Sequence, residues 1–186
     1  MKSDKLKSIE KQIAKLESQR HTESLKCIKK GLKQLFVDFE DLESIGWRQY
    51  TPYWNDGDTC DFTVYNDDPD INGEEVSEWH LKTTLEQVKN EANFLEAIKE
   101  LEEQVDRYKD NEWHSTDQYV ERITDLRDLY ASKKDQARLK YELKRLLAIK
   151  KVLDSISEDE YLNIFGDHVQ VLVTKDGWRT ERAEHG

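Results

Sequence analysis

Apolar residues recur at alternating spacings of three and four along most of this 186-residue chain. The first such run covers 6–42, and two more cover 81–108 and 119–153. This spacing places apolar side chains on one stripe of a helix, and that stripe must be covered by another element. Long helices that pack side by side therefore make up most of the predicted fold.

The first run changes register near its middle. Its apolar positions are Leu6, Ile9, Ile13 and Leu16, then Leu25, Ile28, Leu32, Leu35, Phe39 and Leu42. The polar stretch 17–24 separates the two sets, and the second set does not continue the spacing of the first. Two interpretations stay open: a stutter within one long helix, or a short interruption between two helices.

The second and third runs predict an antiparallel pair of helices. They are similar in length, and the short polar stretch 110–116 joins them. Helices joined by a short turn pack against each other in opposite directions. We therefore expect a coiled-coil hairpin between them.

Two β-hairpins are predicted, one on each side of these two runs. The first has strands at 47–53 and 58–65 around an Asp56-Gly57 turn, followed by a loop at 66–74. The second follows a short apolar helix closed by Gly166, and its valines alternate up to an Asp176-Gly177 turn. Because a two-stranded hairpin alone is only marginally stable, both hairpins should join one sheet.

The predicted fold class is therefore α+β, with long helices and a small antiparallel four-stranded sheet. Its expected parts are an N-terminal helical, coiled-coil segment at 1–45, the first hairpin at 46–75, a helical hairpin insertion at 76–157 and the C-terminal hairpin at 158–186.

Charge disfavours one class of partner. The chain has 40 acidic and 29 basic residues, for a formal net charge of -11. Such a protein repels a phosphate backbone, so we expect no general nucleic-acid binding. A basic protein partner suits this charge better.

The cysteine and apolar patterns restrict where in the cell the protein is expected to act. Cys27 and Cys60 lie far apart and outside any CxxC pattern, so neither a disulfide framework nor a zinc site is predicted. There is no apolar run of the length that crosses a membrane, and no secretory leader is visible. We expect a cytoplasmic protein without a membrane partner.

The aromatic and acidic stretch 47–65 is the candidate binding surface. The residues predicted to bind a ligand or partner are Arg48, Gln49, Tyr53, Trp54, Asn55 and Asp58. Their rings offer flat faces, and their polar groups offer directional hydrogen bonds. Because alternate strand residues face opposite sides, about half of the aromatic residues belong to the core whatever the function.

Metal and catalytic chemistry are disfavoured. Asp56, Asp58 and Asp61 bring carboxylates together, but their spacing departs from a calcium loop, so no metal or cofactor is predicted. Asp167 and His168 are neighbours on an expected strand and should point to opposite faces. Cys60 is expected to be a small buried residue rather than a reactive thiol. The protein is therefore predicted not to be an enzyme.

The stretch from Trp47 to Phe62, WRQYTPYWNDGDTCDF, is accompanied by the C-terminal FGDHV segment 165–169 and the Asp176-Gly177 turn. Together they resemble a group of uncharacterised proteins of tailed phages and bacteria, whose motif reads W-x-Q-Y-T-P-Y-F-N-D-G-D-x-C-x-F. Trp54 stands where the group has phenylalanine. The resemblance covers the two hairpins and implies a phage-type or bacterial cytosolic origin, in which small acidic helical proteins are often inhibitors of host defence or nucleic-acid enzymes.

The expected function is therefore non-catalytic protein–protein recognition, as a phage-type inhibitor of a host protein, by a chain that forms homo-oligomers. The acidic helical faces, for instance Glu100, Glu102, Glu103 and Asp106, are the first surface to test. The alternative is a small-molecule or nucleotide-binding protein, or a hydrolase, that uses the aromatic and acidic hairpin. A pocket converging on Gln49, Tyr53, Asn55 and Asp58 would favour that alternative.

Overall fold

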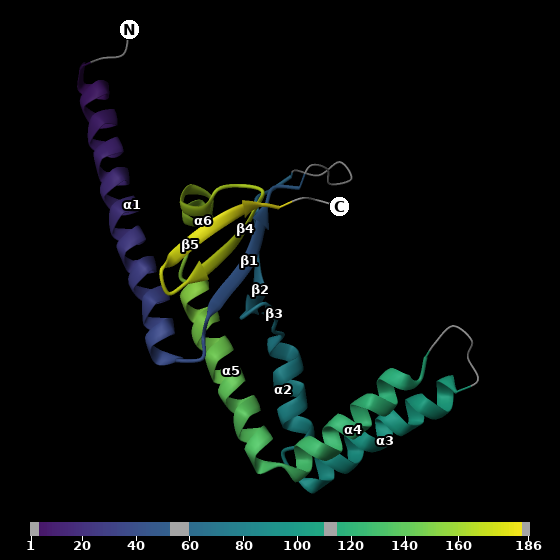
Figure 1. Ribbon diagram of the computed structural model, residues 1–186. Coiled ribbons are helices and arrows are strands. Elements are labelled where there is room, and N and C mark those ends of the chain that lie inside the picture. The colour runs from purple at the N-terminus through teal and green to yellow at the C-terminus, as the bar shows by residue number, and fades with distance from the viewer. Residues whose placement is uncertain (1–3, 53–59, 110–114, 184–186) are drawn as a thin grey trace. The chain divides into compact units, whose positions relative to one another are not determined.

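A computed structural model describes residues 4–52, 60–109 and 115–183, and within them six helices and five strands give an α+β fold (Figure 1). The elements are α1 Asp4–Asp38, β1 Ser44–Tyr50, β2 Thr63–Ile71, β3 Glu74–Glu75, α2 Glu78–Gln87, α3 Glu91–Tyr108, α4 Asp117–Ala131, α5 Lys133–Leu153, α6 Glu158–Phe165, β4 Val169–Thr174 and β5 Gly177–Arg182. The predicted α+β class is confirmed.

The chain divides into two compact units. Unit 1 comprises Met1–Val76 and Ala148–Gly186, and it contains the sheet, α1, α6 and the end of α5. Unit 2 comprises Ser77–Leu147, and it contains α2, α3, α4 and the rest of α5.

The first helix of unit 1, α1, is continuous over 35 residues. The polar stretch 17–24 stays helical, which decides between the two interpretations of the register change. Buried side chains are concentrated in the second half of α1, at Ile28, Leu32, Leu35 and Phe36.

A single antiparallel sheet has the strand order β3-β2-β1-β4-β5. The central strand β1 pairs with β2 on one side and with β4 on the other, with Trp47 opposite Val171 and Gln49 opposite Val169. Both hairpin regions therefore join one sheet, as predicted.

The predicted four-stranded sheet is wrong by one strand, because the expected loop 66–74 contains the end of β2 and the first residue of β3. Asn72 and Gly73 have φ values of 59° and 90° and form the turn between these strands. Two adjacent residues of positive φ suit the twist of a tight hairpin. Pro69 is tolerated because it lies in an irregular stretch of β2, where residues 66–69 all lie between the pairs Arg48–Tyr65 and Gly46–Asp70.

The C-terminal hairpin between β4 and β5 is present, with its turn one position earlier than expected. Thr174 pairs with Gly177, so Lys175 and Asp176 form the turn and Gly177 opens β5. The Asp56-Gly57 turn predicted for the first hairpin lies outside the described residues.

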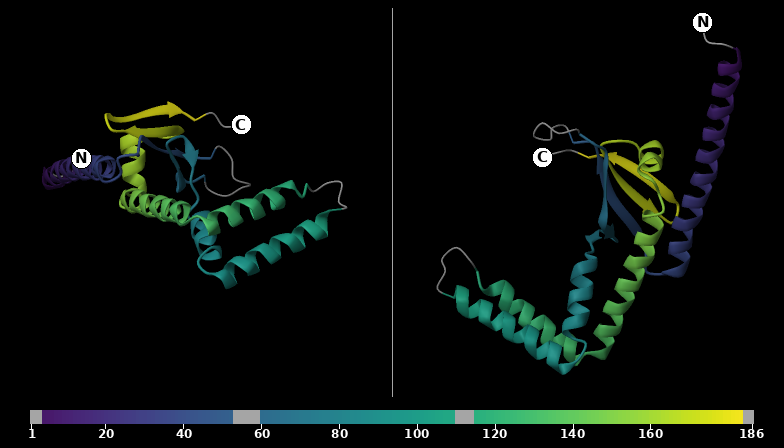
Figure 2. Two further views of the ribbon diagram at one scale, coloured as in Figure 1. Left: turned by 60° about the horizontal axis from the view of Figure 1, so that its bottom comes forward. Right: turned by 180° about the vertical axis from the view of Figure 1, so that it is seen from behind.

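Helices cover one face of the sheet in unit 1. Ile45, Trp47, Val171 and Val173 are buried on this face. The Trp47 ring meets Tyr161 and Phe165 of α6 edge-on, at centroid distances of 5.8 Å and 5.1 Å. Figure 2 shows α6 between the sheet and α1, in agreement with its contacts to both α1 and β2.

Unit 2 is built around α3 and α4, which run in opposite directions. Phe94 near the start of α3 stacks on Tyr130 near the end of α4, at a centroid distance of 4.2 Å. Tyr108 and Tyr119 stack at the other end, 6.1 Å apart. Val88, Ala97, Ile98, Ile123 and Leu126 form its buried core. Coiled-coil packing of this pair stays a prediction.

The two long helices predicted for this region are each divided. The run 81–108 breaks before α3, where the Asn90 side chain accepts a hydrogen bond from the Asn93 backbone and caps the helix. The run 119–153 breaks at Ser132, whose backbone is extended and whose hydroxyl accepts from the Asp135 backbone. Side chains that form hydrogen bonds with nearby backbone groups compete with a continuous helix. The spacing of apolar residues gives no indication of these helix ends.

Candidate functional site

The second face of the sheet carries the best candidate for a binding surface. Side chains alternate along β1, so Ile45, Trp47 and Gln49 point toward the helices while Arg48 and Tyr50 point away. A hollow of about 540 Å³ lies on this second face, and residues of β1, β2, β3 and β4 line it. We call it the sheet groove; its described lining residues are Gly46, Trp47, Arg48, Tyr50, Thr63, Val64, Tyr65, Asp67, Asp68, Asp70, Glu75 and Gln170.

Two tyrosines form a flat platform in the sheet groove. The rings of Tyr50 and Tyr65 are stacked, with centroids 4.8 Å apart and planes inclined by 15°. A hydrogen bond with Tyr50, assisted by partial burial, raises the pKa of the Tyr65 hydroxyl above its ordinary value. The Tyr65 hydroxyl is therefore neutral at physiological pH, and the Tyr65 side chain stays accessible.

Carboxylates dominate the charge of the sheet groove. Asp67, Asp68, Asp70 and Glu75 line it together with Arg48, which is the one basic residue among the described lining residues. Asp70 is held in place because its carboxylate accepts from the Gly73 backbone at 2.7 Å. Gly46 makes room for it, since a Cβ there would lie 3.2 Å from the Asp70 Cβ.

The predicted binding residues Arg48 and Gln49 lie on opposite faces of β1. Arg48 is exposed in the sheet groove, but Gln49 is fully buried, so its prediction as an exposed binding residue is wrong. Its amide nitrogen donates to the backbone oxygens of Tyr161 and Gly166. Gln49 therefore joins β1 to α6.

The other predicted binding residues, Tyr53, Trp54, Asn55 and Asp58, lie outside the described residues, as does Asp56. Asp61 and Cys60 are described, and both are exposed. The expectation that Cys60 is buried on a strand is wrong, because β2 begins only at Thr63.

Asp167 and His168 approach each other, contrary to the expectation for neighbouring strand residues. His168 has a φ of 55° and precedes β4, and its Nε2 lies 3.7 Å from an Asp167 carboxylate oxygen. The carboxylate also accepts from the Thr51 backbone and hydroxyl, each at 2.8 Å. Although burial opposes it, hydrogen bonds from Thr51 and His168 lower the pKa of Asp167. These contacts fix the chain beyond β1.

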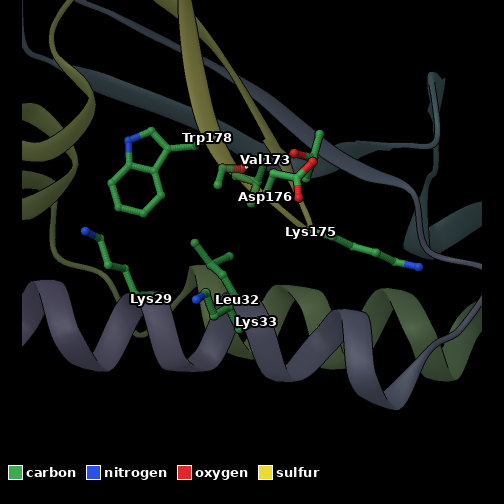
Figure 3. A pocket seen from close by; sticks show the side chains of 9 residues that line it. Lys29, Leu32, Lys33, Val173, Lys175, Asp176 and Trp178 are labelled. Carbon is green, nitrogen blue, oxygen red and sulfur yellow. Dashed lines mark hydrogen bonds between the residues drawn. The ribbon is translucent and has the colours of Figure 1, made fainter.

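A second cavity, of about 310 Å³, lies between α1 and the β4–β5 turn (Figure 3). The Lys29 ammonium lies 5.1 Å from the centre of the Trp178 ring, and Asp176 and Lys33 also line the space. In Figure 3 Lys175 extends away from the other labelled side chains. Sequence reasoning did not find this cavity, because α1 and β5 are brought together only by folding.

No family model, curated protein or solved structure matches this chain. Within the described ranges, no group of three or more His, Cys, Asp or Glu side chains is arranged to hold a metal ion. The same ranges contain no helix that is both long and apolar enough to cross a membrane.

Proposed function

We propose that this protein is a non-catalytic protein-binding protein, and that its sheet groove holds a basic segment of the partner. The observation that carries this proposal is the combination of four carboxylates with a stacked tyrosine pair on one accessible sheet face. Carboxylates attract lysine and arginine side chains, and tyrosine faces accept their cationic groups and their aliphatic stems.

The sheet groove is a stronger candidate than the acidic helical faces of unit 2. Three of the acidic residues predicted there are already paired: Glu102 with Arg127, Glu103 with Lys99 and Asp106 with Lys109. In contrast, the exposed carboxylates of Asp67 and Asp68 form no ion pair or hydrogen bond with other side chains of the described residues. Unpaired carboxylates offer more attraction to an incoming cation than paired ones.

The resemblance of the hairpins to phage and bacterial proteins supports a bacterial host protein as the partner and the cytoplasm as the place of action. Self-association of the chain is part of the same proposal. It is supported by the apolar residues that α1 exposes.

The second candidate function is binding of a small anionic molecule such as a nucleotide. One observation favours it: Lys29, Lys33 and the Trp178 ring line the same cavity. Ammonium groups bind phosphate, and an indole offers an apolar surface to a base.

Binding of a fluorescent lysine- and arginine-rich peptide, measured by anisotropy, tests the proposal. We expect Asp67→Asn with Asp68→Asn to weaken binding by roughly five- to tenfold, because two attractive charges are lost. The double variant Glu96→Gln and Glu100→Gln removes the same charge from exposed positions of α3 and should leave binding unchanged.

Replacing Arg48 tests the sheet groove by a charge change of the opposite sign. Arg48→Ala makes the sheet groove more acidic, so it should strengthen binding of the basic peptide. Weaker peptide binding by Arg48→Ala, or equal losses from the two double variants, would contradict the proposed use of the groove. Nucleotide binding that is lost in Lys29→Ala with Lys33→Ala would support the second candidate.

A further inference from the structure

The first half of α1 is exposed around its whole circumference. Every residue from Lys5 to Arg20 is exposed, and the segment Lys5–Leu16 extends past the sheet and α6 (Figure 1), whereas Glu17, Ser18 and Arg20 line a hollow together with residues of α6. At 1.5 Å per residue the segment Lys5–Leu16 is about 18 Å long. A helix of that length is only marginally stable in water on its own, so packing against another surface would stabilise it.

An apolar stripe runs along this exposed half. Leu6, Ile9, Ile13 and Leu16 are 49%, 45%, 49% and 64% exposed, and their spacing of three, four and three gives the core positions of two heptads. We call these four residues the α1 stripe. It lies about a quarter of a turn around the helix from the buried positions Ile28, Leu32 and Leu35. The core of unit 1 therefore cannot cover it.

The charges beside the α1 stripe fit a second copy of the same helix. If Leu6 and Ile13 take position a of the heptad, Lys5 and Gln12 take position g, and Glu10 and Glu17 take position e. In a parallel pair in register, Lys5 of each copy therefore lies opposite Glu10 of the other copy, and Gln12 lies opposite Glu17. In an antiparallel pair, Glu10 would instead face Glu17 of the other copy, and these like charges repel. Charge complementarity thus selects the parallel arrangement.

We propose that the exposed half of α1 forms a parallel two-stranded coiled coil with the same segment of a second copy, in register through the α1 stripe. This inference rests on the self-association proposed above and adds its surface, orientation and register. It is independent of the sheet groove, which uses other residues.

Sedimentation equilibrium of the full chain over a range of concentrations tests the pairing. We expect a monomer–dimer equilibrium that Ile9→Asp with Ile13→Asp weakens roughly a hundredfold or more, because charges replace apolar contacts in both copies. Val37→Asp is the matched control: Val37 is a 70% exposed apolar residue of α1 outside the α1 stripe, and its replacement should not change the dimer constant. Circular dichroism melting checks that each variant folds.

The orientation is tested by charge reversal at the flanks. Glu10→Lys and Lys5→Glu should each weaken the dimer roughly fivefold, and the double variant should restore it. A wild type that stays monomeric, or an equal loss in Val37→Asp, would overturn the coiled coil. A dimer strengthened by Glu10→Lys would overturn the parallel arrangement. The double variant Ile9→Asp with Ile13→Asp leaves the sheet groove intact and should still bind the basic peptide. Failure of the coiled coil is therefore distinguishable from failure of the proposed function.

Discussion

The indole nitrogen of Trp47 donates a hydrogen bond of 3.0 Å to the side-chain oxygen of Gln49, two residues further along the same buried face of β1. The Gln49 amide nitrogen in turn donates to two backbone oxygens of α6 and its C-cap, at Tyr161 and Gly166. A buried amide that satisfies all its groups in this way joins the sheet to the helix layer.

Replacing Gln49 should therefore destabilise unit 1. In Gln49→Leu the Trp47 indole and two backbone oxygens lose their buried partner, which should lower the free energy of unfolding by about 2–4 kcal/mol. Urea denaturation followed by tryptophan fluorescence measures it. Arg48→Ala on the accessible face is the matched control and should change stability by less than about 0.5 kcal/mol. Similar losses in both variants would contradict the assigned burial.

Asp167 should make part of the stability depend on acid pH. Its folded pKa is lowered, so its carboxylate stabilises the fold above its unfolded pKa, near the ordinary value of 3.8, and this contribution is lost as pH falls through the lower folded pKa. Asp167→Asn should reduce the slope of stability against pH below about pH 4. Urea midpoints between pH 7 and pH 2.5 measure this slope. Asp176→Asn, in an exposed turn, should leave it unchanged.

Gly73 should be intolerant of a β-branched residue. Its φ is +90°, while no atom lies within 4 Å of where its Cβ would be, so a substitution there is opposed by backbone strain alone. Gly73→Val should lower the free energy of unfolding by about 1 kcal/mol or more. Thermal melting compares it with Glu74→Val, one residue later on β3, which should be nearly neutral. An unchanged melting temperature in Gly73→Val would contradict the positive-φ turn.

In unit 2, the pKa of His80 depends on the nearby charge of Arg122. Burial, with the nearby Arg122 charge as the second cause, lowers the pKa of His80 below its ordinary 6.5. In Arg122→Leu the charge is gone and burial remains, so the pKa of His80 should rise and still stay below 6.5. Proton NMR titration of the imidazole measures it.

The same Arg122→Leu variant should also be less stable. Arg122 donates to the Thr84 hydroxyl at 2.6 Å and to the Gln87 side chain at 3.3 Å, and these two hydrogen bonds join α4 to α2.

In the NMR titration, a His80 pKa that falls or does not change in Arg122→Leu would contradict the proximity of the His80 and Arg122 charges. Arg127→Leu, whose ion pair with Glu102 is exposed, is the control and should leave the His80 pKa in place.

The sequence was sufficient for features whose cause is local. Apolar spacings of three and four predicted the helical regions, and alternating valines followed by turn formers predicted the β4–β5 hairpin, because helix and strand periods are properties of consecutive residues. The marginal stability of isolated hairpins was enough to predict one shared sheet. The exposed α1 stripe was also visible as a run whose register does not continue into the next.

The tertiary structure decided which of two alternating faces is covered. Strand alternation separates Arg48 from Gln49, but the choice between core and surface depends on Tyr161, 112 residues beyond Gln49. The sheet groove likewise depends on β2, which continues through 66–71 and brings its carboxylates beside β1. The turn-forming residues in this stretch had instead predicted a loop. Burial is settled by contacts between segments distant in the chain, and no local period records those contacts.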